Sequence, residues 1–336
     1  MKRCFILIFI CFCLLSCSNE CVSINDDFSK KRVVSLIEWN LQTFFDGETL
    51  GTEYAEFVKS DSWNRSKYES RLKKLCDFIA KENADVFVFE EIENIGIIHD
   101  ISNSLAGFSW SDSEKWMYSC FAKNEGTSIG CGIISKFPIM SVKTHEMDIR
   151  VQRVSQPSSR PLIQASLDVD GKSLDVFVAH WKSKSGGELE TEIWRDWQES
   201  LCGYRLKNFS CENRAAIVCG DFNRNAEDFF CRIGSCNNEK NTFFRFVDFG
   251  CSGQIGLFSP WLVRNEVELF KTGSYFYQNE WERIDNIFGL GEFRILDFCP
   301  LDDGEWVNED GTPFRYTMYN EKGYSDHLPI SCKIEL

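Results

Sequence analysis

Five short segments, far apart in the chain, each place an oxygen or imidazole group at or near the end of an apolar run. Because apolar runs of this kind are typical of strands, we expect these groups to lie where strands of a sheet end. Carboxylates hold hard divalent cations and imidazoles transfer protons. The set therefore predicts a metal-dependent phosphoesterase. The segments are Trp39-Asn40, Glu90-Glu91, His180 to Lys184, Gly220 to Asn223 and Gly323 to Ile330.

The residues with side-chain oxygens differ in how specifically they indicate a metal or phosphate site. Glu91 follows the run Val86–Phe89 and is placed to hold a metal, although a solvated acidic strand end has the same pattern. Asn40 can offer its amide oxygen to a metal or its amide hydrogens to phosphate, or it can simply cap a turn. Asp221 and Asn223 are two residues apart after a glycine, so both can face one ligand; the alternative is an Asx-turn.

The histidines suggest the proton chemistry. His180 ends an apolar run and is followed by Lys182, a combination suited to phosphate contact. His327 precedes the last apolar run and could take a proton from water if a carboxylate orients it. Asp285 is the best candidate for that carboxylate, because it is polar within an otherwise apolar run. For each histidine the alternative is an ordinary strand end.

The amino-terminus predicts export and a lipid anchor. Lys2 and Arg3 precede an apolar stretch over residues 4–15, and Leu14-Leu15-Ser16-Cys17 resembles a bacterial lipobox. We therefore expect a signal peptide over 1–16, lipidation at Cys17, a polar tether over 17–30 and attachment to a membrane of the cell envelope. A plain secretory signal and an uncleaved anchor are the alternatives.

Composition and charge limit the partners. The chain has 336 residues with 29 Phe and 10 Trp, which is typical of a globular protein. Without Lys2 and Arg3, 35 basic residues stand against 51 acidic ones, a formal charge of −16. This charge argues against general electrostatic capture of nucleic acid, although a site loaded with metal inverts its own charge.

The pattern of the remaining chain predicts one mixed α/β domain over residues 31–336, with two stacked sheets flanked by helices. Helical periods cover 63–83 and 190–207, where Ile193, Trp197, Leu201 and Tyr204 share one face. Gly171-Lys172 predicts a hairpin turn. Cys219 and Cys332 lie in strand-like runs and are expected in the core, whereas four other cysteines are disulfide candidates: Cys211, Cys231, Cys236 and Cys251. Strand-like runs cover 33–39, 85–89, 132–135, 162–169, 174–180, 215–219, 284–288 and 328–334.

Together the motifs resemble the endonuclease/exonuclease/phosphatase superfamily, which has the deoxyribonuclease I-like fold. The resemblance covers nearly all of residues 32–336. Its segments stand in family order: Glu38 to Leu41, Phe89 to Ile92, Gly132 to Ile139, Ala179 to Ser183, Gly220 to Asn223, Arg283 to Asp285 and Ser325 to Pro329.

The resemblance implies a four-layer α/β sandwich of two mixed, mainly antiparallel sheets flanked by helices. It also implies Mg²⁺, or Mn²⁺, held chiefly by Glu91 with Asn40 and Asp326 nearby. His327 matches the general base, Asp285 matches the residue that orients it, and His180 matches a second active-site histidine. Asp221 and Asn223 match positions that bind phosphate, the nucleophile or a second metal. Glu90 is a departure, because the family usually has Gln there.

The segment from His180 to Gly187, followed by Trp194-Arg195, resembles bacterial extracellular nuclease-like members. Arg160 and Arg195 would then meet phosphate, or form structural ion pairs. We therefore expect a monomeric, membrane-anchored phosphodiesterase of the cell envelope that cleaves DNA or RNA. One alternative is an enzyme acting on phospholipid head groups or small phosphate esters. Another is a surface lipoprotein that binds a partner without catalysis.

Overall fold

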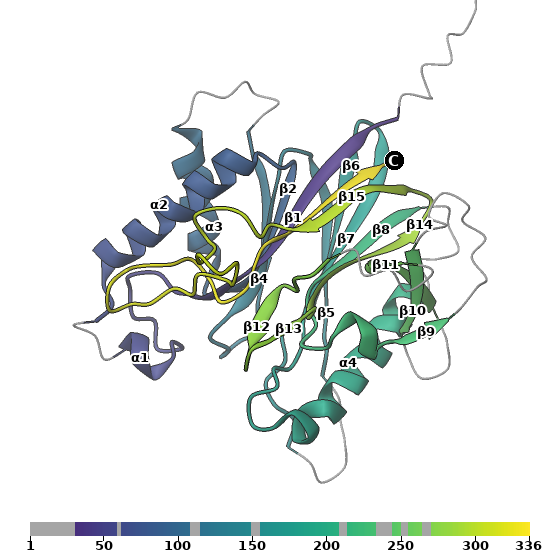
Figure 1. Ribbon diagram of the computed structural model, residues 1–336. Coiled ribbons are helices and arrows are strands. Elements are labelled where there is room, and N and C mark those ends of the chain that lie inside the picture. Colours follow the sequence, from purple (N-terminus) through teal and green to yellow (C-terminus); the bar gives the residue numbers. More distant parts are fainter. Residues whose placement is uncertain are drawn as a thin grey trace, which may run out of the picture. The chain divides into compact units, whose positions relative to one another are not determined.

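The apolar runs form strands of two large β-sheets (Figure 1). In the first sheet the strand order is β15 (Arg294–Pro300), β16 (Ile330–Glu335), β1 (Val33–Phe44), β2 (Val86–Ile92), β4 (Gly130–Ser135) and β3 (Tyr118–Ala122). In the second it is β5 (Ile139–His145), β6 (Leu162–Val169), β7 (Lys172–His180), β8 (Ala215–Asp221), β14 (Asp285–Gly291), β11 (Ile255–Val263), β10 (Phe244–Phe249) and β9 (Phe230–Arg232).

The computed structural model describes residues 31–58, 62–107, 115–148, 155–207, 214–232, 244–249, 255–263 and 270–336. The predicted signal peptide, Cys17 and the tether lie outside these residues, as do Cys211, Cys236 and Cys251 and the side chain of Cys231. Residues 32–336 form one compact unit. None of the helices in the described ranges is long and apolar enough to cross a bilayer.

Both sheets are mixed and mainly antiparallel, as predicted. β1 pairs in parallel with β2, and β7 pairs in parallel with β8. The other pairings between the described strands are antiparallel. The hairpin expected at Gly171 joins β6 to β7, and Gly171 has the positive φ of 88° that such a turn needs.

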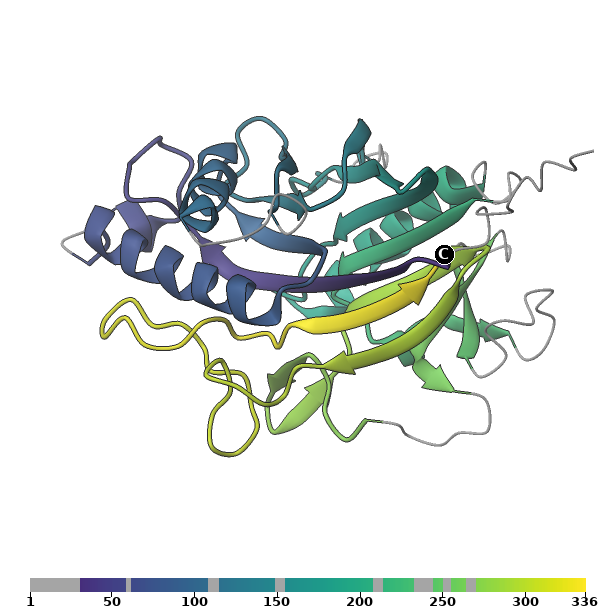
Figure 2. The ribbon, with the colours of Figure 1, turned by 90° about the horizontal axis from the view of Figure 1, so that it is seen from above.

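Side-chain alternation along the strands divides the apolar residues between two cores. In β2, Val86 and Val88 face the second sheet, whereas Phe87 and Phe89 point to the other side. That outer side is covered by α2 (Arg65–Glu82) and α3 (Ile95–Ala106), which run along it in Figures 1 and 2. This explains why β2 is a continuous apolar run, since both of its faces are buried.

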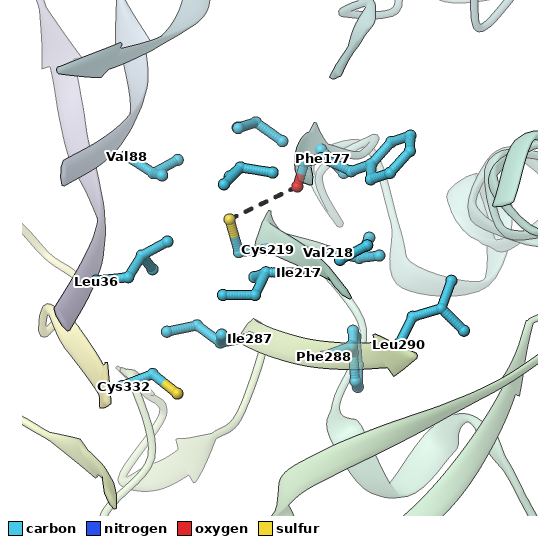
Figure 3. Packing of buried hydrophobic residues seen from close by; sticks show 14 of the residues in the cluster. Leu36, Val88, Phe177, Ile217, Val218, Cys219, Ile287, Phe288, Leu290 and Cys332 are labelled. Carbon is cyan, nitrogen blue, oxygen red and sulfur yellow. Dashed lines mark hydrogen bonds between the residues drawn. The ribbon is translucent and has the colours of Figure 1, made fainter. Parts of the chain in front are cut away.

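The core between the sheets is shown in Figure 3. Cys219 and Ile287 point from the second sheet toward Leu36 and Val88 of the first. Phe288 lies on the opposite side of its strand, where residues from the second sheet pack under α4 (Glu188–Lys207). Helix, sheet, sheet and helix therefore form four layers. Cys219 and Cys332 are buried free thiols, which confirms their predicted place in the core.

Helix α4 lies where the sequence predicts it, but with an unexpected orientation. Trp194, Gln198 and Cys202 are buried, and Cys202 is part of the core that the second sheet forms. The apolar face of Ile193 and Trp197 is about half exposed, at 44% and 45%. The short α1 (Ala55–Val58) and the hairpin of β12 (Tyr275–Tyr277) and β13 (Glu280–Glu282) lie outside the two large sheets.

Gly220 is a position where the fold requires glycine. It precedes Asp221 in β8 with a φ of 128°, and a Cβ atom there would lie 1.9 Å from the carbonyl oxygen of Ala179. The same Cβ would lie 3.1 Å from Oε1 of Glu90. The backbone of β7 and the buried carboxyl group of Glu90 therefore lie too close to β8 for residue 220 to carry a side chain.

We predict that Gly220→Ala lowers the free energy of unfolding by about 3 kcal/mol or more, because the backbone strain adds to a clash that cannot relax. Gly171→Ala is the matched control: its φ is also positive, at 88°, but no atom lies within 4 Å of the added Cβ. It should cost about 1 kcal/mol. Urea denaturation of both variants measures the difference, and equal losses would contradict the close approach at Gly220.

Candidate active site

The predicted catalytic segments meet at one end of the two sheets, around a cleft of about 1050 Å³. Strand register explains part of this convergence. His180 pairs with Asp221 between β7 and β8, and Asp221 pairs with Asp285 between β8 and β14. The three side chains therefore stand in a row across three neighbouring strands. Glu91, Asp326 and His327 line the same cleft.

A bulge in the central strands directs Glu91 toward the cleft. The register between β1 and β2 shifts between Asn40 and Phe44, and Gln42 and Thr43 both have left-handed backbones with φ near 50°. Glu91 itself has a φ of 61°. The backbone N–H of Thr43 donates to Oε2 of Glu91 at 2.7 Å. Bulges and strained backbones of this kind commonly re-aim side chains at functional sites.

Arg71, from α2, holds this bulge from behind. Its guanidinium is buried and donates to the backbone carbonyl oxygens of Leu41, Gln42 and Thr43 at 2.6, 2.8 and 3.0 Å. The aromatic ring of Tyr316 lies 4.0 Å from the guanidinium carbon. Burial lowers the pKa of Arg71 to about 10, so the group remains a cation at neutral pH. Arg71 thus satisfies carbonyl groups that leave the regular strand pairing.

Asn40 links the two sheets at the cleft. Its amide nitrogen donates to Oε1 of Glu91 at 3.3 Å and to Oδ2 of Asp221 at 3.1 Å. Its amide oxygen accepts the backbone N–H of Gln42 at 3.0 Å. In this arrangement Asn40 orients the two carboxylates, and its own oxygen is directed at the bulge. Its role as a metal ligand stays a prediction.

His327 and Asp285 form the expected pair. Nδ1 of His327 lies 2.8 Å from Oδ2 of Asp285, so Nε2 is the ring nitrogen left for the cleft. The indole of Trp39 donates to the backbone oxygen of His327 at 2.9 Å, and the indole of Trp261 donates to that of Asp285 at 2.9 Å. Burial opposes the charged imidazole, but the carboxylates of Asp285, Asp221 and Asp326 together outweigh this effect and raise the pKa of His327 to about 10.

Buried carboxyl groups crowd this end of the space between the sheets. Burial, together with the charges of Asp285 and Glu91, raises the pKa of Asp221 to about 7. Burial also raises the pKa of Glu90 to about 8, with Asp285 and Asp221 adding to the effect. The pKa of Glu38 is raised well above its usual value by burial and by Glu90. Glu90 thus joins Glu38 between the sheets, whereas Glu91 lines the cleft.

The donor set fits a hard divalent cation. Ligand atoms of Asp221, Asp285 and His327 lie within 4.8 Å of one another, and Oδ1 of Asp285 is buried without a hydrogen-bond partner among the residues that the structure describes. Carboxylate oxygens are the ligands that Mg²⁺ and Mn²⁺ prefer. A cation beside Glu91 and Asp221 would also relieve the repulsion that raises the pKa of Asp221. Asp326 lines the cleft too, 3.9 Å from the guanidinium of Arg315.

His180 is buried in the cleft wall between two carboxylates. Its Nε2 lies 3.8 Å from Oε1 of Glu91 and 3.7 Å from Oδ2 of Asp221. The same nitrogen contacts the guanidinium of Arg160, which also donates to the carbonyl oxygen of Trp181 at 3.2 Å. Burial and the charge of Arg160 lower the pKa of His180 well below its usual value. His180 is therefore neutral, and Nε2 accepts from Arg160.

None of the three predicted phosphate ligands, Lys182, Arg160 and Arg195, is part of the cleft lining. The ammonium of Lys182 donates to the backbone oxygens of Ser183 and Ser185, at 3.0 and 3.1 Å. The guanidinium of Arg195 is fully buried and donates to the carbonyl oxygens of Lys182 and Glu188, at 3.1 and 2.8 Å. Both side chains stabilise the loop after β7. Lys184, on the same loop, lines the cleft instead.

Asn223 is held in the turn after β8. Its backbone N–H donates to Oδ1 of Asp221 at 2.8 Å, which is the Asx-turn considered as an alternative. Its side chain is buried and lines the cleft. The next residue, Arg224, forms ion pairs with three carboxylates of α4 and ties the turn to that helix: Glu192, Asp196 and Glu199.

Sequence reasoning missed several residues that build the site. Arg71 looks like one more charge on an amphipathic helix, and only its burial shows its role. Ser274 is buried and joins the segments that carry His327 and Asp285: its hydroxyl accepts the backbone N–H of Asp285 at 3.1 Å, and its carbonyl oxygen accepts that of Leu328 at 2.7 Å. Tyr275 packs on the ring of His327. The alternation Tyr275-Phe276-Tyr277 is a signal that could have indicated a two-faced strand.

Comparison with known proteins agrees with this geometry. The model of the Endonuclease/Exonuclease/phosphatase family matches residues 37–327. The chain therefore belongs to that family. None of the curated proteins gives a significant match.

Solved structures share the fold at low sequence identity. TDP2 from Caenorhabditis elegans is 13% identical with a TM-score of 0.55, over 91% of this chain and 75% of that one. A mannosyl-6-phosphatase from Bacteroides thetaiotaomicron is 14% identical with a TM-score of 0.53, over 90% and 99%. A family protein from Bacteroides vulgatus is 14% identical with a TM-score of 0.52, over 91% and 100%. These likenesses establish the fold and leave the substrate open.

We predict that the metal-free protein loses stability as the pH rises from 5 to 9. Asp221 and Glu90 have folded-state pKa values of about 7 and 8, raised above their ordinary values, so the native state holds protons that the unfolded chain releases. Each such group costs about 1.4 kcal/mol per pH unit between its unfolded and folded pKa values. Denaturant unfolding in chelator should show this fall, and saturating Mg²⁺ should reduce it. Stability that rises over this range would contradict the buried acids.

Proposed function

We propose that this protein is a divalent-metal-dependent phosphoester hydrolase. One observation carries the proposal: the hydrogen-bonded pair of His327 and Asp285 opens into the same cleft as Glu91 and Asp221. A proton acceptor and a set of hard oxygen ligands thus face one space. Family membership supports the same chemistry, because the matching family model is named for nucleases and phosphatases.

The residues around the cleft suit attack by water on phosphorus. Once the ring is neutral, Nε2 of His327 takes the proton from the attacking water while the bond from phosphorus to the ester oxygen breaks, and the imidazolium can return this proton to the departing oxygen. Asp285 fixes the ring tautomer through Nδ1 and stabilises the imidazolium that forms. Glu91 and Asp221 would hold a divalent cation, which would supply positive charge for the phosphate and would lower the pKa of His327, so that Nε2 is free to accept a proton. Asn223 can donate hydrogen bonds to oxygens that become more negative.

Carboxylates dominate the lining of the cleft. Among the described lining residues, the cations besides histidine are Lys184 and Arg315, and Lys184 is already paired with Glu282 at 3.0 Å. Seven acidic residues line the same space: Glu56, Glu91, Glu188, Asp221, Glu280, Glu282 and Asp326. A bound cation would neutralise the inner carboxylates, but the outer ones would still repel a second phosphate. This observation favours small phosphate esters over the nucleic acid substrate expected from the sequence, and the nuclease activity stays a prediction.

We predict that Glu91→Gln and His327→Ala each reduce hydrolysis of bis-(4-nitrophenyl) phosphate by about 100-fold or more, because one removes a metal-ligand charge and the other the proton acceptor. Chelator should abolish turnover by the wild type, and added Mg²⁺ or Mn²⁺ should restore it.

His145→Ala is the control, because this histidine lies on β5 and contacts Gln164 at a distance from the catalytic segments. Thermal unfolding shows whether each variant is folded. Turnover near that of the wild type in folded Glu91→Gln or His327→Ala would refute the assigned roles. Inactivity of the wild type toward every ester, combined with tight binding of a surface partner, would instead support the non-catalytic alternative.

We further propose that the chain is attached to a membrane of the cell envelope through lipid on Cys17. The proposal is supported by the basic start, the apolar stretch and the lipobox-like sequence of residues 1–17. Labelling with radioactive palmitate in a bacterial host should mark the wild type and fail to mark Cys17→Ala. Cys21→Ala is the control, and an equally labelled Cys17→Ala would exclude this attachment site.

A further inference from the structure

We propose that the β12–β13 hairpin is a substrate subsite for an uncharged ring that carries hydroxyl groups, so that the ester hydrolysed is a sugar phosphate. The inference rests on the proposed phosphoester hydrolysis and names the organic part of its substrate. The hairpin borders the cleft, and the side chains of Tyr275, Tyr277, Glu280 and Glu282 line it.

Strand register gives the hairpin a regular cleft face. Tyr275 stands opposite Glu282, and Tyr277 stands opposite Glu280. The alternate residues Phe276 and Trp281 pack against each other with ring centroids 5.0 Å apart, and Trp281 packs on the core beneath α2 and α3. The apolar pair therefore attaches the hairpin to the domain, and the tyrosine–glutamate pairs are left for the cleft.

Aromatic rings lead outward from the catalytic histidine. The ring of Tyr275 lies 4.7 Å from that of His327, between centroids. Tyr277 continues the row, 6.2 Å from Tyr275 and inclined by 18°, and it is 54% exposed. A ring joined to a phosphate beside His327 would therefore find an aromatic surface at the next position. Tyrosine offers such a surface together with a hydroxyl group for hydrogen bonding.

The hairpin is attached firmly to the catalytic pair. Ser274, at its root, is buried; its hydroxyl accepts the backbone N–H of Asp285, and its carbonyl oxygen accepts that of Leu328. Its own N–H donates to the carbonyl oxygen of Glu282 at 2.9 Å. The distance from the tyrosines to His327 is thus fixed by backbone hydrogen bonds, as a subsite that positions a leaving group requires.

The charges on the hairpin decide which ring fits. An ionised carboxylate only accepts hydrogen bonds, and sugar hydroxyl groups donate them. Glu282 is paired with Lys184 at 3.0 Å, whereas Glu280 is exposed and no described cation forms an ion pair with it. A polynucleotide would bring further phosphates toward Glu280, where like charges repel. A sugar places its ring on the tyrosines and its hydroxyl groups near Glu280 without that penalty.

The test compares four substrates with Mg²⁺ present: glucose 6-phosphate, glycerol 3-phosphate, thymidine 5′-monophosphate and a single-stranded oligonucleotide. We expect the wild type to prefer glucose 6-phosphate over the other three by about tenfold in kcat/KM. Tyr277→Ala should reduce the preference for glucose 6-phosphate over glycerol 3-phosphate about tenfold, mainly through KM. Glu280→Gln should act in the same direction.

Tyr319→Ala and Glu309→Gln are matched controls, because Tyr319 is 95% exposed and neither residue lines the cleft. Both should keep the preference of the wild type. Calorimetric titration of glucose 6-phosphate with Ca²⁺ in place of Mg²⁺ measures binding without relying on turnover.

The outcomes separate the two proposals. Binding that depends on Tyr277, in a protein that hydrolyses no ester, would uphold the subsite and refute the hydrolase. Hydrolysis with an unchanged preference in both hairpin variants would refute the subsite and uphold the hydrolase. Preference for the nucleotide or the oligonucleotide would also overturn the subsite. A wild type that neither binds nor hydrolyses glucose 6-phosphate overturns it as well.

Discussion

The site depends on the burial of several carboxyl groups of like charge in one small space between two sheets. An isolated buried carboxylate is costly, and neighbouring carboxylates raise the cost. The protein compensates in two ways on its own: His327 carries a proton beside Asp285, and burial raises the pKa of Glu90 so that this group can stay neutral. The remaining charge, on Glu91 and Asp221, is the kind that a divalent cation balances.

The need to bring these carboxyl groups together explains why the backbone around Asn40 and Glu91 is irregular and yet held by several hydrogen bonds. A regular strand would send Glu90 and Glu91 to opposite faces and leave Glu91 away from the cleft edge. The bulge after Asn40 brings the N–H of Thr43 to Glu91, and Arg71 satisfies the carbonyl groups that the bulge releases. The strain of three left-handed residues is thus supported by a buried cation from a helix.

The sequence predicted the strands that carry the site and the helices α2 and α4, because apolar runs and periodicity reflect local burial. It did not predict α3 or the strands β3, β5, β10, β11 and β15. The strands that carry the site and the helix α2 lie within a few residues of the predicted ranges, and the four-layer sandwich is confirmed. α4 shows the limit of such patterns: its periodic face of Ile193 and Trp197 is half exposed, while the buried face includes Arg195 and Gln198. Periodicity identifies a helix, but tertiary contacts decide which face is covered.

The candidate site was predictable where a residue acts at a strand end, and unpredictable where it acts through long-range contacts. His327 meets Asp285, and Glu91 meets Asp221 through Asn40, as convergence at one sheet edge requires. The cations could not be assigned in this way. Lys182 follows the same strand as His180 in sequence, yet its ammonium bonds the backbone of its own loop, and Arg195 bonds that backbone from α4.

Three buried arginines therefore stabilise the backbone that forms the walls of the cleft, and their guanidinium groups are already bonded to the protein. Arg71 supports the bulge, Arg195 the loop after β7, and Arg224 the turn that carries Asn223. With these cations committed to carbonyl groups and α4 carboxylates, the fixed positive charges in the described lining of the cleft are Lys184, which is paired with Glu282, and Arg315. The proposed hydrolysis would therefore rely on a bound cation to meet the phosphate, and the proposed subsite on the uncharged and acidic groups of the rim to meet the organic part. A single phosphate on a neutral ring fits both proposals, whereas a chain of phosphates fits only the first.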